Sequence, residues 1–356
     1  MAKKPTGREG NGGLDQLKAD LKAGQYGRLY LFHGEEHYLR DHYLQMLRSK
    51  LLDGPAEEFN YHRFTQETMD FEMLADAVEA MPMMAEYSMV QVDDCDLSKL
   101  SESNRDTLIR ILSDIPEYCV VVFVFDSVEL KFDGRQKKLK EVIDRGLTVE
   151  FARQSQRELT TWIRRHFRSH EKEIADKLCE YLTFITGGTM TALGSEIGKI
   201  AAYASDTEIT MQDIQAVVTP VLDAEVFDLT DAIAEGDYEK ALLKLRTLMQ
   251  MQQEAIPLLA AIGGQMRRLL YAKTAMREGR GESGVAELLK LSMGRAPHSY
   301  VLQKTITTAR MVSDAFCAKA VTLCMEADAQ LKGFSGDDQR TMELLLLNLA
   351  QEVRRG

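Results

Sequence analysis

The sequence predicts an α/β domain with a parallel sheet, followed by a long, mainly helical region. Up to about residue 152, short apolar segments typical of strands alternate with segments of helical periodicity. Such alternation is typical of a parallel sheet covered by helices on both faces. From Arg157 onward the pattern is almost entirely helical. A hydrophobic content of 45% over 356 residues is sufficient for two or three domain cores.

The elements of the first part follow from local patterns. The N-terminal residues 1–13 lack an apolar segment and are expected to form a flexible tail, after which Leu14, Leu17 and Leu21 recur at helical spacing. Strands are expected at residues 29–32, 59–65, 88–92, 119–125 and 147–151. Helices are expected between them at residues 37–52, 70–81, 101–115 and 134–146. The segment CVVVFVF is apolar throughout, as in a strand that is buried on both faces.

The second part divides at a change in helix length. Several helices, interrupted by TGGT, are expected up to Val218, and Pro220 follows. Longer helical periods then cover residues 226–236, 238–250, 256–276, 299–333 and 342–355. We therefore expect an α/β domain over 14–152, a small helical domain over 153–219 and a helical bundle over 220–356.

Composition restricts the function classes. The five cysteines form no CxxC pair, which favours reduced thiols, a cytoplasmic location and no structural zinc. No apolar run approaches the length needed to cross a bilayer, and the N-terminus lacks the apolar segment of a signal peptide. The net charge of −11 argues against indiscriminate nucleic-acid binding, although local basic patches can still contact phosphate.

One stretch, YLFHGEEHYLRDHY, begins like a phosphate-binding loop. A strand, Gly34 and a helix follow one another as in the pattern G-x-x-x-x-G-K-[ST]. On that pattern the second glycine is Leu39, the lysine is Arg40 and the hydroxyl residue is Asp41, while Glu35 and Glu36 lie within the loop. The alternative is a plain strand-to-helix turn without nucleotide history. Both interpretations predict that the loop does not bind ATP productively.

A second fragment, VQVDD, ends the strand at 88–92 with Asp93 and Asp94. AAA+ ATPases carry Asp-Glu at the equivalent place, where the pair holds magnesium and activates water. Acidic pairs at strand ends are common, so this signal is weak by itself. With the order and spacing of the elements, it resembles an AAA+ domain whose chemistry is absent.

Over nearly its whole length the chain resembles the δ-subunit family of bacterial DNA polymerase III clamp loaders. The resemblance rests on YLFHGEEHYLRD, EAMPMMAEYSMVQV, GRQKKLKEVI, LTTWIRRHF, GGTMTALGSEIGKIAAYA, VFDLTDAIAEGDYEKALLKL, GQMRRLLYAK and MEADAQLKG, in that order. None is a catalytic fingerprint, and their joint order is what makes the match specific. The resemblance implies an AAA+ RecA-like sheet domain, a helical lid domain and a helical collar, without ATPase activity, cofactor or metal.

The resemblance also implies partners. Such a subunit assembles with the motor (gamma/tau) subunits and the delta-prime subunit in a hetero-pentamer, binds the beta sliding clamp, and opens the ring for loading on primed DNA. The family places two adjacent large apolar residues in a hydrophobic pocket of the clamp, and Met83 and Met84, after Pro82, match those positions. The alternative is that both methionines pack beneath the edge of the sheet.

Contacts with DNA are expected from a basic segment and one aromatic residue. The cluster includes Lys131, Arg135 and Lys137, near positions that face DNA in AAA+ loaders, although a solvated helix face is the usual explanation of such a run. Phe334, in a glycine-rich turn, either stacks on an unpaired base or staples two helices. His166 and His170 have metal-ligand spacing but no third ligand nearby in sequence.

Two other functions remain to be separated. A working AAA+ ATPase of the same loader is disfavoured by the missing Gly-Lys-[ST] and by the missing four-cysteine zinc site of the motor subunits. The delta-prime subunit carries a Ser-Arg-Cys motif, which does not occur here. A helical scaffold protein unrelated to replication would have Met83 and Met84 buried and no affinity for a sliding clamp.

Overall fold

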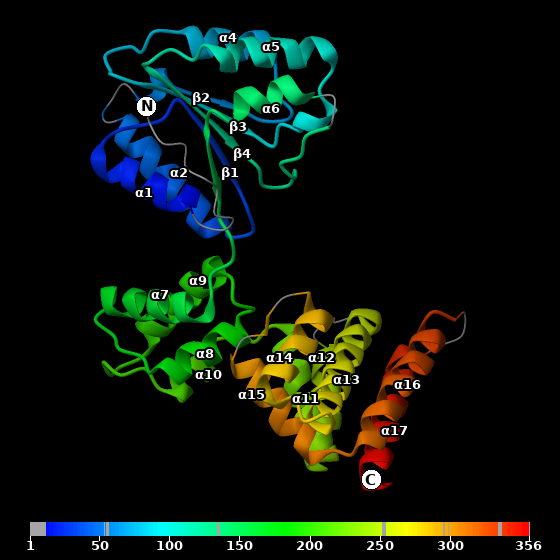
Figure 1. Ribbon diagram of the computed structural model, residues 1–356. Helices are drawn as coiled ribbons and strands as arrows, with labels where there is room; N and C mark the ends of the chain where they lie inside the picture. The colour runs from blue at the N-terminus through cyan, green and yellow to red at the C-terminus, as the bar shows by residue number, and fades with distance from the viewer. Residues whose placement is uncertain are drawn as a thin grey trace. The chain divides into compact units, whose positions relative to one another are not determined.

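The computed structural model describes residues 12–52, 54, 57–133, 136–250, 254–294, 296–297, 299–333 and 337–355. Its chain forms two compact units, Met1–Gln154 and Ser155–Gly356 (Figure 1). The first is an α/β unit and the second is helical, so the predicted fold class is confirmed. The finer division of the second unit near residue 219 stays a prediction. No helix of the described residues is long and apolar enough to cross a bilayer.

The first unit is built on a five-stranded parallel sheet with strand order β2-β3-β4-β1-β5. The strands are β1 (Leu29–His33), β2 (Tyr61–Phe64), β3 (Ser88–Asp93), β4 (Cys119–Val124) and β5 (Leu147–Glu150). Central β4 pairs with β3 and with β1, and Leu31 lies opposite Phe123. Successive residues of β1 are buried on opposite faces, because side chains alternate along a strand and both faces are covered.

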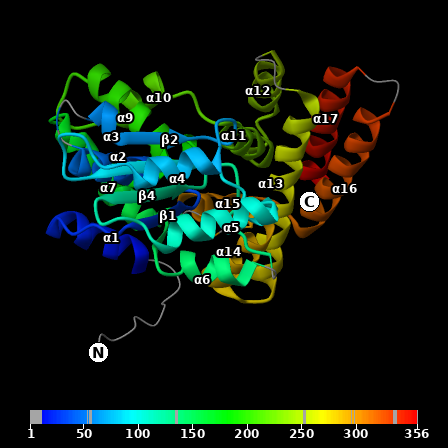
Figure 2. The same cartoon turned by 90° about the horizontal axis from the view of Figure 1, so that it is seen from above.

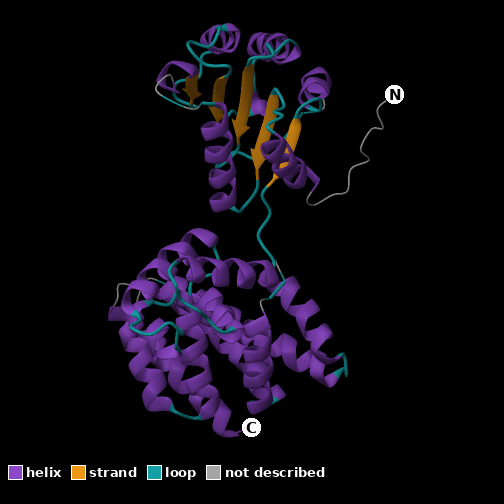
Figure 3. Cartoon of the chain, turned by 90° about the vertical axis from the view of Figure 1, so that its left-hand side faces the viewer, coloured by secondary structure: helices purple, strands orange, loops and turns teal. Residues whose placement is uncertain are grey.

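Helices cover both faces of this sheet (Figure 3). They are α1 (Gly12–Ala23), α2 (His37–Leu51), α3 (Glu57–Asn60), α4 (Phe71–Glu79), η1 (Leu97–Lys99), α5 (Glu102–Ser113) and α6 (Lys137–Ile143). Apolar residues of α1 and α2 pack on one face, and those of α4, α5 and α6 pack on the other. Side-chain caps begin three of them, since Asp70 accepts hydrogen bonds at the start of α4, Asp96 at the start of η1 and Ser101 at the start of α5.

Several boundaries in this unit differ from the prediction. Helix α1 begins at Gly12, within the expected tail, and residues 1–11 of that tail lie outside the described residues. Phe59 and Asn60 belong to the short helix α3 rather than to a strand. Helix α4 ends at Glu79, before the expected Met81, because Ala80 leaves the helical conformation with ψ 129°.

The second unit is composed of helices. They are α7 (Gln156–Ser169), α8 (Asp176–Ile185), α9 (Met190–Tyr203), α10 (Met211–Val217), α11 (Leu222–Glu235), α12 (Tyr238–Gln250), α13 (Ala255–Arg277), α14 (Gly281–Met293), α15 (Ser299–Met311), α16 (Asp314–Leu331) and α17 (Asp338–Arg355). Helix α13 packs against α11, α14, α15 and α16. Helices α16 and α17 lie side by side (Figures 1 and 2).

Two features of the helical unit were not predicted. The helical period over 299–333 is divided into α15 and α16, because Ser313 caps a new helix by accepting from the backbone N–H of Phe316 at 3.1 Å. Helix α14 was missed, since Gly281 and Gly284 weaken its helical signal. Buried Cys317 and Cys324 pack in the core of this unit.

Candidate functional site

The loop between α4 and β3 presents two methionines to solvent. Met83 is 57% exposed and Met84 is 97% exposed, while Pro82 before them is partly buried. The alternative in which both methionines pack beneath the edge of the sheet is therefore wrong. Burying such a side chain against a partner gains roughly 1.5–3 kcal/mol, so the loop has the chemistry of an apolar contact.

This loop has a defined conformation because other elements fix it. The buried side chain of Asn60 donates from Nδ2 to the carbonyl of Met83 at 2.9 Å and accepts from the backbone N–H of Met83 at 2.6 Å. The Tyr118 hydroxyl donates to the carbonyl of Glu79 at 2.9 Å, at the other end of the loop. Met84 has a φ of 53°, a left-handed conformation that is uncommon for residues other than glycine. Such outliers persist only where the surrounding structure holds them.

Sequence reasoning missed both of these supporting residues. Asn60 lies in a segment that was predicted as a strand, where asparagine is disfavoured, and that mismatch was the available signal. Tyr118 precedes a strand whose apolar run gave no reason to single it out.

The loop that resembles a phosphate-binding loop, after β1, packs against the chain that follows β5. Gly34 has a φ of 122°, and a Cβ at this position would lie 2.4 Å from the carbonyl oxygen of Phe151. The backbone N–H of Glu36 donates to the same carbonyl at 2.8 Å. The glycine is therefore required by the close approach of the chain after β5, and one amide at the mouth of α2 is already engaged.

Three charged residues in this loop and the helix after it form ion pairs within the protein, and Glu36 is buried. Glu35 forms an ion pair with Arg153 at 2.8 Å. Arg40, at the position of the lysine, is buried and forms ion pairs with Asp126 at 2.5 Å and with Asp41 at 2.9 Å. Leu39 packs against the core on the α1–α2 face of the sheet. The cation that would neutralise a phosphate is thus neutralised by two carboxylates.

The acidic pair at the end of β3 also serves the fold. Asp93 forms an ion pair with Arg63 at 2.6 Å. The Asp94 carboxylate accepts from the backbone N–H groups of Asp126, Ser127 and Val128 at 2.7, 2.9 and 3.2 Å. Burial acts to raise the pKa of Asp94, but these three donors outweigh burial and the net pKa is lowered. Both aspartates border a cavity of about 380 Å³ beside Arg40.

Of the residues predicted to contact DNA, the structure describes Lys131 and Lys137. Lys131 is exposed and pairs with Glu129 at 2.6 Å. Lys137 is exposed at the start of α6. Arg135 and Phe334 lie outside the described residues. Contact with DNA through these positions stays a prediction.

The remaining candidate chemistry has structural explanations. The ring of His166 stacks on Trp162 with centroids 4.7 Å apart, and His170 lies 6.1 Å from His166. Within the described ranges, no group of three or more metal-binding side chains converges. All five cysteines are buried as free thiols.

Comparisons with known proteins identify the family. The family model described as DNA polymerase III, delta subunit matches residues 30–152, and the model for its C-terminal domain matches residues 223–349. The DNA polymerase III subunit delta of Bacillus subtilis (strain 168) is 24% identical over 335 residues, covering 92% of this chain and 94% of that protein. A "Probable DNA polymerase III subunit delta" of Aquifex aeolicus (strain VF5) is 23% identical, covering 71% and 72%.

A solved structure supports the fold. The Bacillus subtilis DNA clamp loader delta protein superposes with a TM-score of 0.56 at 22% identity, covering 95% of this chain and 99% of that one. The two family models together match most of the chain, on both sides of the boundary between the α/β and helical units. The chain therefore belongs to the DNA polymerase III delta subunit family, the clamp-loader subunits of DNA replication.

Proposed function

We propose that this chain binds the beta sliding clamp through Pro82, Met83 and Met84 and holds one interface of the ring open for loading on primed DNA. The observation that supports this most is the exposure of Met84, 97%, at the tip of a loop whose backbone is fixed by Asn60. An exposed apolar side chain in a left-handed conformation adds no packing energy to the chain by itself. It does gain free energy when a partner buries it in an apolar pocket.

The energetics of this contact are favourable. Burying Met84 and the exposed 57% of Met83 contributes about 2–5 kcal/mol. Methionine adapts to an irregular pocket because its side chain is unbranched and flexible. A loop that is already ordered loses little conformational entropy on binding, so more of this free energy appears as affinity.

We further propose that the chain neither binds nor hydrolyses ATP. Arg40 is engaged with Asp126 and Asp41, and the N–H of Glu36 is engaged with Phe151, so the cation at the lysine position is already neutralised and one amide of the loop is already occupied. We expect no heat of binding in calorimetry at millimolar ATP with magnesium. Measurable binding there would favour the alternative, an ATP-hydrolysing subunit of the same loader.

The helical unit is proposed to join the motor (gamma/tau) and delta-prime subunits in a hetero-pentamer, in which ATP is hydrolysed by the motor subunits. The helices from about residue 220 onward would form the collar, and those of 153–219 the lid. This assembly places the chain in the cytoplasm, at the replisome on the nucleoid. Co-purification with these subunits after co-expression tests the assignment directly.

The clamp contact is tested by surface plasmon resonance on the immobilised cognate clamp without nucleotide. The wild type is compared with a Met83→Asp/Met84→Asp variant and with a Leu291→Asp control, which adds a charge at an apolar residue of α14 that is 77% exposed. We expect the double variant to lose binding and the control to retain it. Equal binding by all three would place the contact elsewhere, and binding by none would contradict the proposed function.

Ring opening needs a separate readout. A fluorophore and a quencher are placed on opposite sides of one clamp interface, and emission is followed on addition of this chain. We expect emission to rise with wild type and not with the double variant. Binding without a rise in emission would show a clamp-binding protein that does not open the ring.

A further inference from the structure

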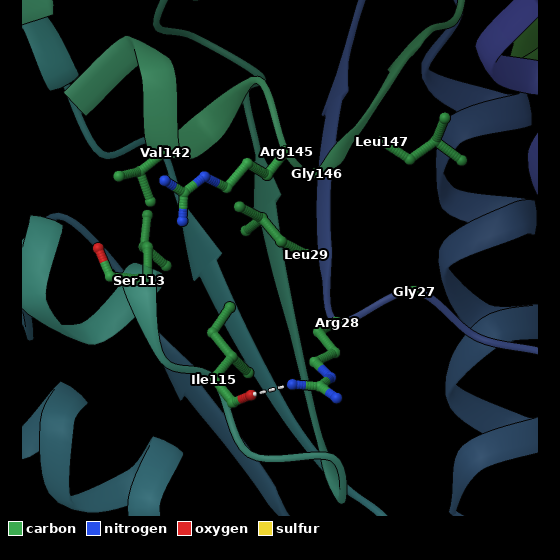
Figure 4. Close-up of a pocket in the computed structure, with 10 residues that line it drawn as sticks. Gly27, Arg28, Leu29, Ser113, Ile115, Val142, Arg145, Gly146 and Leu147 are labelled. Carbon is green, nitrogen blue, oxygen red and sulfur yellow. Dashed lines mark hydrogen bonds between the residues drawn. The ribbon is translucent and has the colours of Figure 1, made fainter. Parts of the chain in front are cut away.

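A pocket of about 490 Å³ lies at the edge of the sheet where the strands begin (Figure 4). Leu29, Ile115 and Val142 give it an apolar lining. Among its ten lining residues the charged ones are both arginines, Arg28 and Arg145. The pocket therefore combines apolar walls with positive charge, which suits an apolar group that lies next to a carboxylate.

The two arginines differ in how they are engaged. Arg28 donates from Nη1 to the carbonyl of Ile115 at 3.0 Å and pairs with Glu117 at 2.8 Å. The exposed Arg145 extends toward Val142 (Figure 4), and no carboxylate of the described residues forms an ion pair with it. Its guanidinium is thus the group that is available to a ligand, and guanidinium binds carboxylates through two parallel hydrogen bonds.

This pocket lies on the same edge of the sheet as the methionine loop. In a parallel sheet with crossover helices, each helix ends where the next strand begins. Helices α4, α5 and α6 pack side by side on one face, the loop with Met83 and Met84 follows α4, and the pocket lies between the ends of α5 and α6. The hydrogen bond from Tyr118 to Glu79 joins the end of α4 to the segment after α5 that carries Ile115.

The separation of the two features fits a single interface. Strand β1, which begins at the pocket, is two strands from β3 and three strands from β2, which begins just after the Asn60 that holds Met83. Neighbouring strands lie about 4.8 Å apart, so the pocket and the loop are separated by on the order of 10–15 Å. A standard protein interface covers about 800 Å² on each partner, which corresponds to a patch about 30 Å wide. A partner that binds the methionine loop through an interface of this size would therefore also cover the pocket.

We propose that this pocket is a second contact for the protein that binds the methionine loop, accepting an apolar side chain and a neighbouring carboxylate from the surface of the sliding clamp. This inference depends on the proposed function. Nucleic acid fits the pocket less well, because no aromatic ring lines it for a base to stack on. The carboxylate is held by Arg145, while Arg28 supports the wall through Ile115.

The test measures binding of the full chain to the immobilised cognate clamp. Arg145→Glu replaces the available guanidinium with a repelling carboxylate, and Lys140→Glu is the matched control, an exposed cation in the last turn of α6 that does not line the pocket. We expect Arg145→Glu to weaken binding by at least about tenfold, mainly through faster dissociation, as for the loss of one charge-assisted hydrogen bond. Lys140→Glu is expected to remain within about twofold, as for a peripheral charge.

A second variant tests occupancy of the pocket without disturbing the core. Ser113 lines the pocket and is exposed, so Ser113→Trp fills the space from its rim. We expect weaker clamp binding at unchanged thermal stability. If Arg145→Glu and Ser113→Trp bind like wild type while Met83→Asp/Met84→Asp does not, the second contact is refuted and the proposed function stands. If the double methionine variant also binds like wild type, the proposed function itself fails.

Discussion

Replacing Asn60 with alanine tests whether a preformed loop contributes to partner binding. Asn60 is 1% exposed, so a partner on the surface would not touch it, and it makes two hydrogen bonds with the backbone of Met83. Each such bond contributes roughly 1 kcal/mol net, so the variant loses about 2 kcal/mol of interactions that order the loop. If that free energy must be supplied on binding, clamp affinity falls by up to about 30-fold, although both methionine side chains are retained.

The assay must separate loop ordering from general destabilisation. Asp70→Ala is a suitable control, because it removes the cap of α4, two hydrogen bonds at 2.9 and 3.1 Å, at the end of that helix away from the loop. Both variants are expected to unfold at lower denaturant concentration, and only Asn60→Ala is expected to lose clamp affinity in surface plasmon resonance. Wild-type affinity of Asn60→Ala, or an equal loss in Asp70→Ala, would refute the reasoning.

Two further predictions concern stability and thiol chemistry. The pKa of Asp94 is lowered in the folded protein. Its charge therefore stabilises the fold at pH values above the ordinary pKa of 3.8, and this contribution is lost as the pH falls through the folded-state pKa. Asp94→Asn is therefore expected to lower the free energy of unfolding, measured in urea, by about 1 kcal/mol at pH 7, and the difference from wild type is expected to shrink in acid. A difference that does not change with pH would argue against a charge effect. Burial raises the pKa of Cys95 and Cys324 to about 12, so iodoacetamide at pH 8 is expected to modify neither thiol until urea unfolds the chain. Modification of native protein, detected by mass spectrometry, would show that these sites open.

Much of the fold was predictable because its signals are local. The alternation of apolar segments and helical periods placed all five strands of the described sheet and helices α2, α4, α5 and α6 between them, with errors of a few residues at their ends. The start of α16 was missed because Ser313 acts through one cap inside an otherwise continuous helical pattern. Helix ends depend on single hydrogen bonds, which periodicity does not record.

The candidate site was predictable in part. Consecutive Met83 and Met84 after Pro82 stood out in the sequence, and their exposure agrees with an apolar contact. The support that Asn60 gives to Met83 was not visible in the sequence, because Asn60 and Met83 are 23 positions apart and belong to different elements. Arg40 and Asp126 are 86 positions apart in the sequence, and they form an ion pair only because β1 and β4 are neighbours in the sheet.

The sequence by itself determined the class of most elements and the loss of the phosphate-binding residues, since strand and helix periods and a missing Gly-Lys-[ST] are properties of short segments. Only the tertiary structure decided what replaced them. The strand order β2-β3-β4-β1-β5 brings Arg40 to Asp126, places Asp94 against the segment after β4, and assembles the pocket beside Arg145 from three separate segments. Contacts between distant segments depend on how the sheet is ordered, and no local pattern specifies that order.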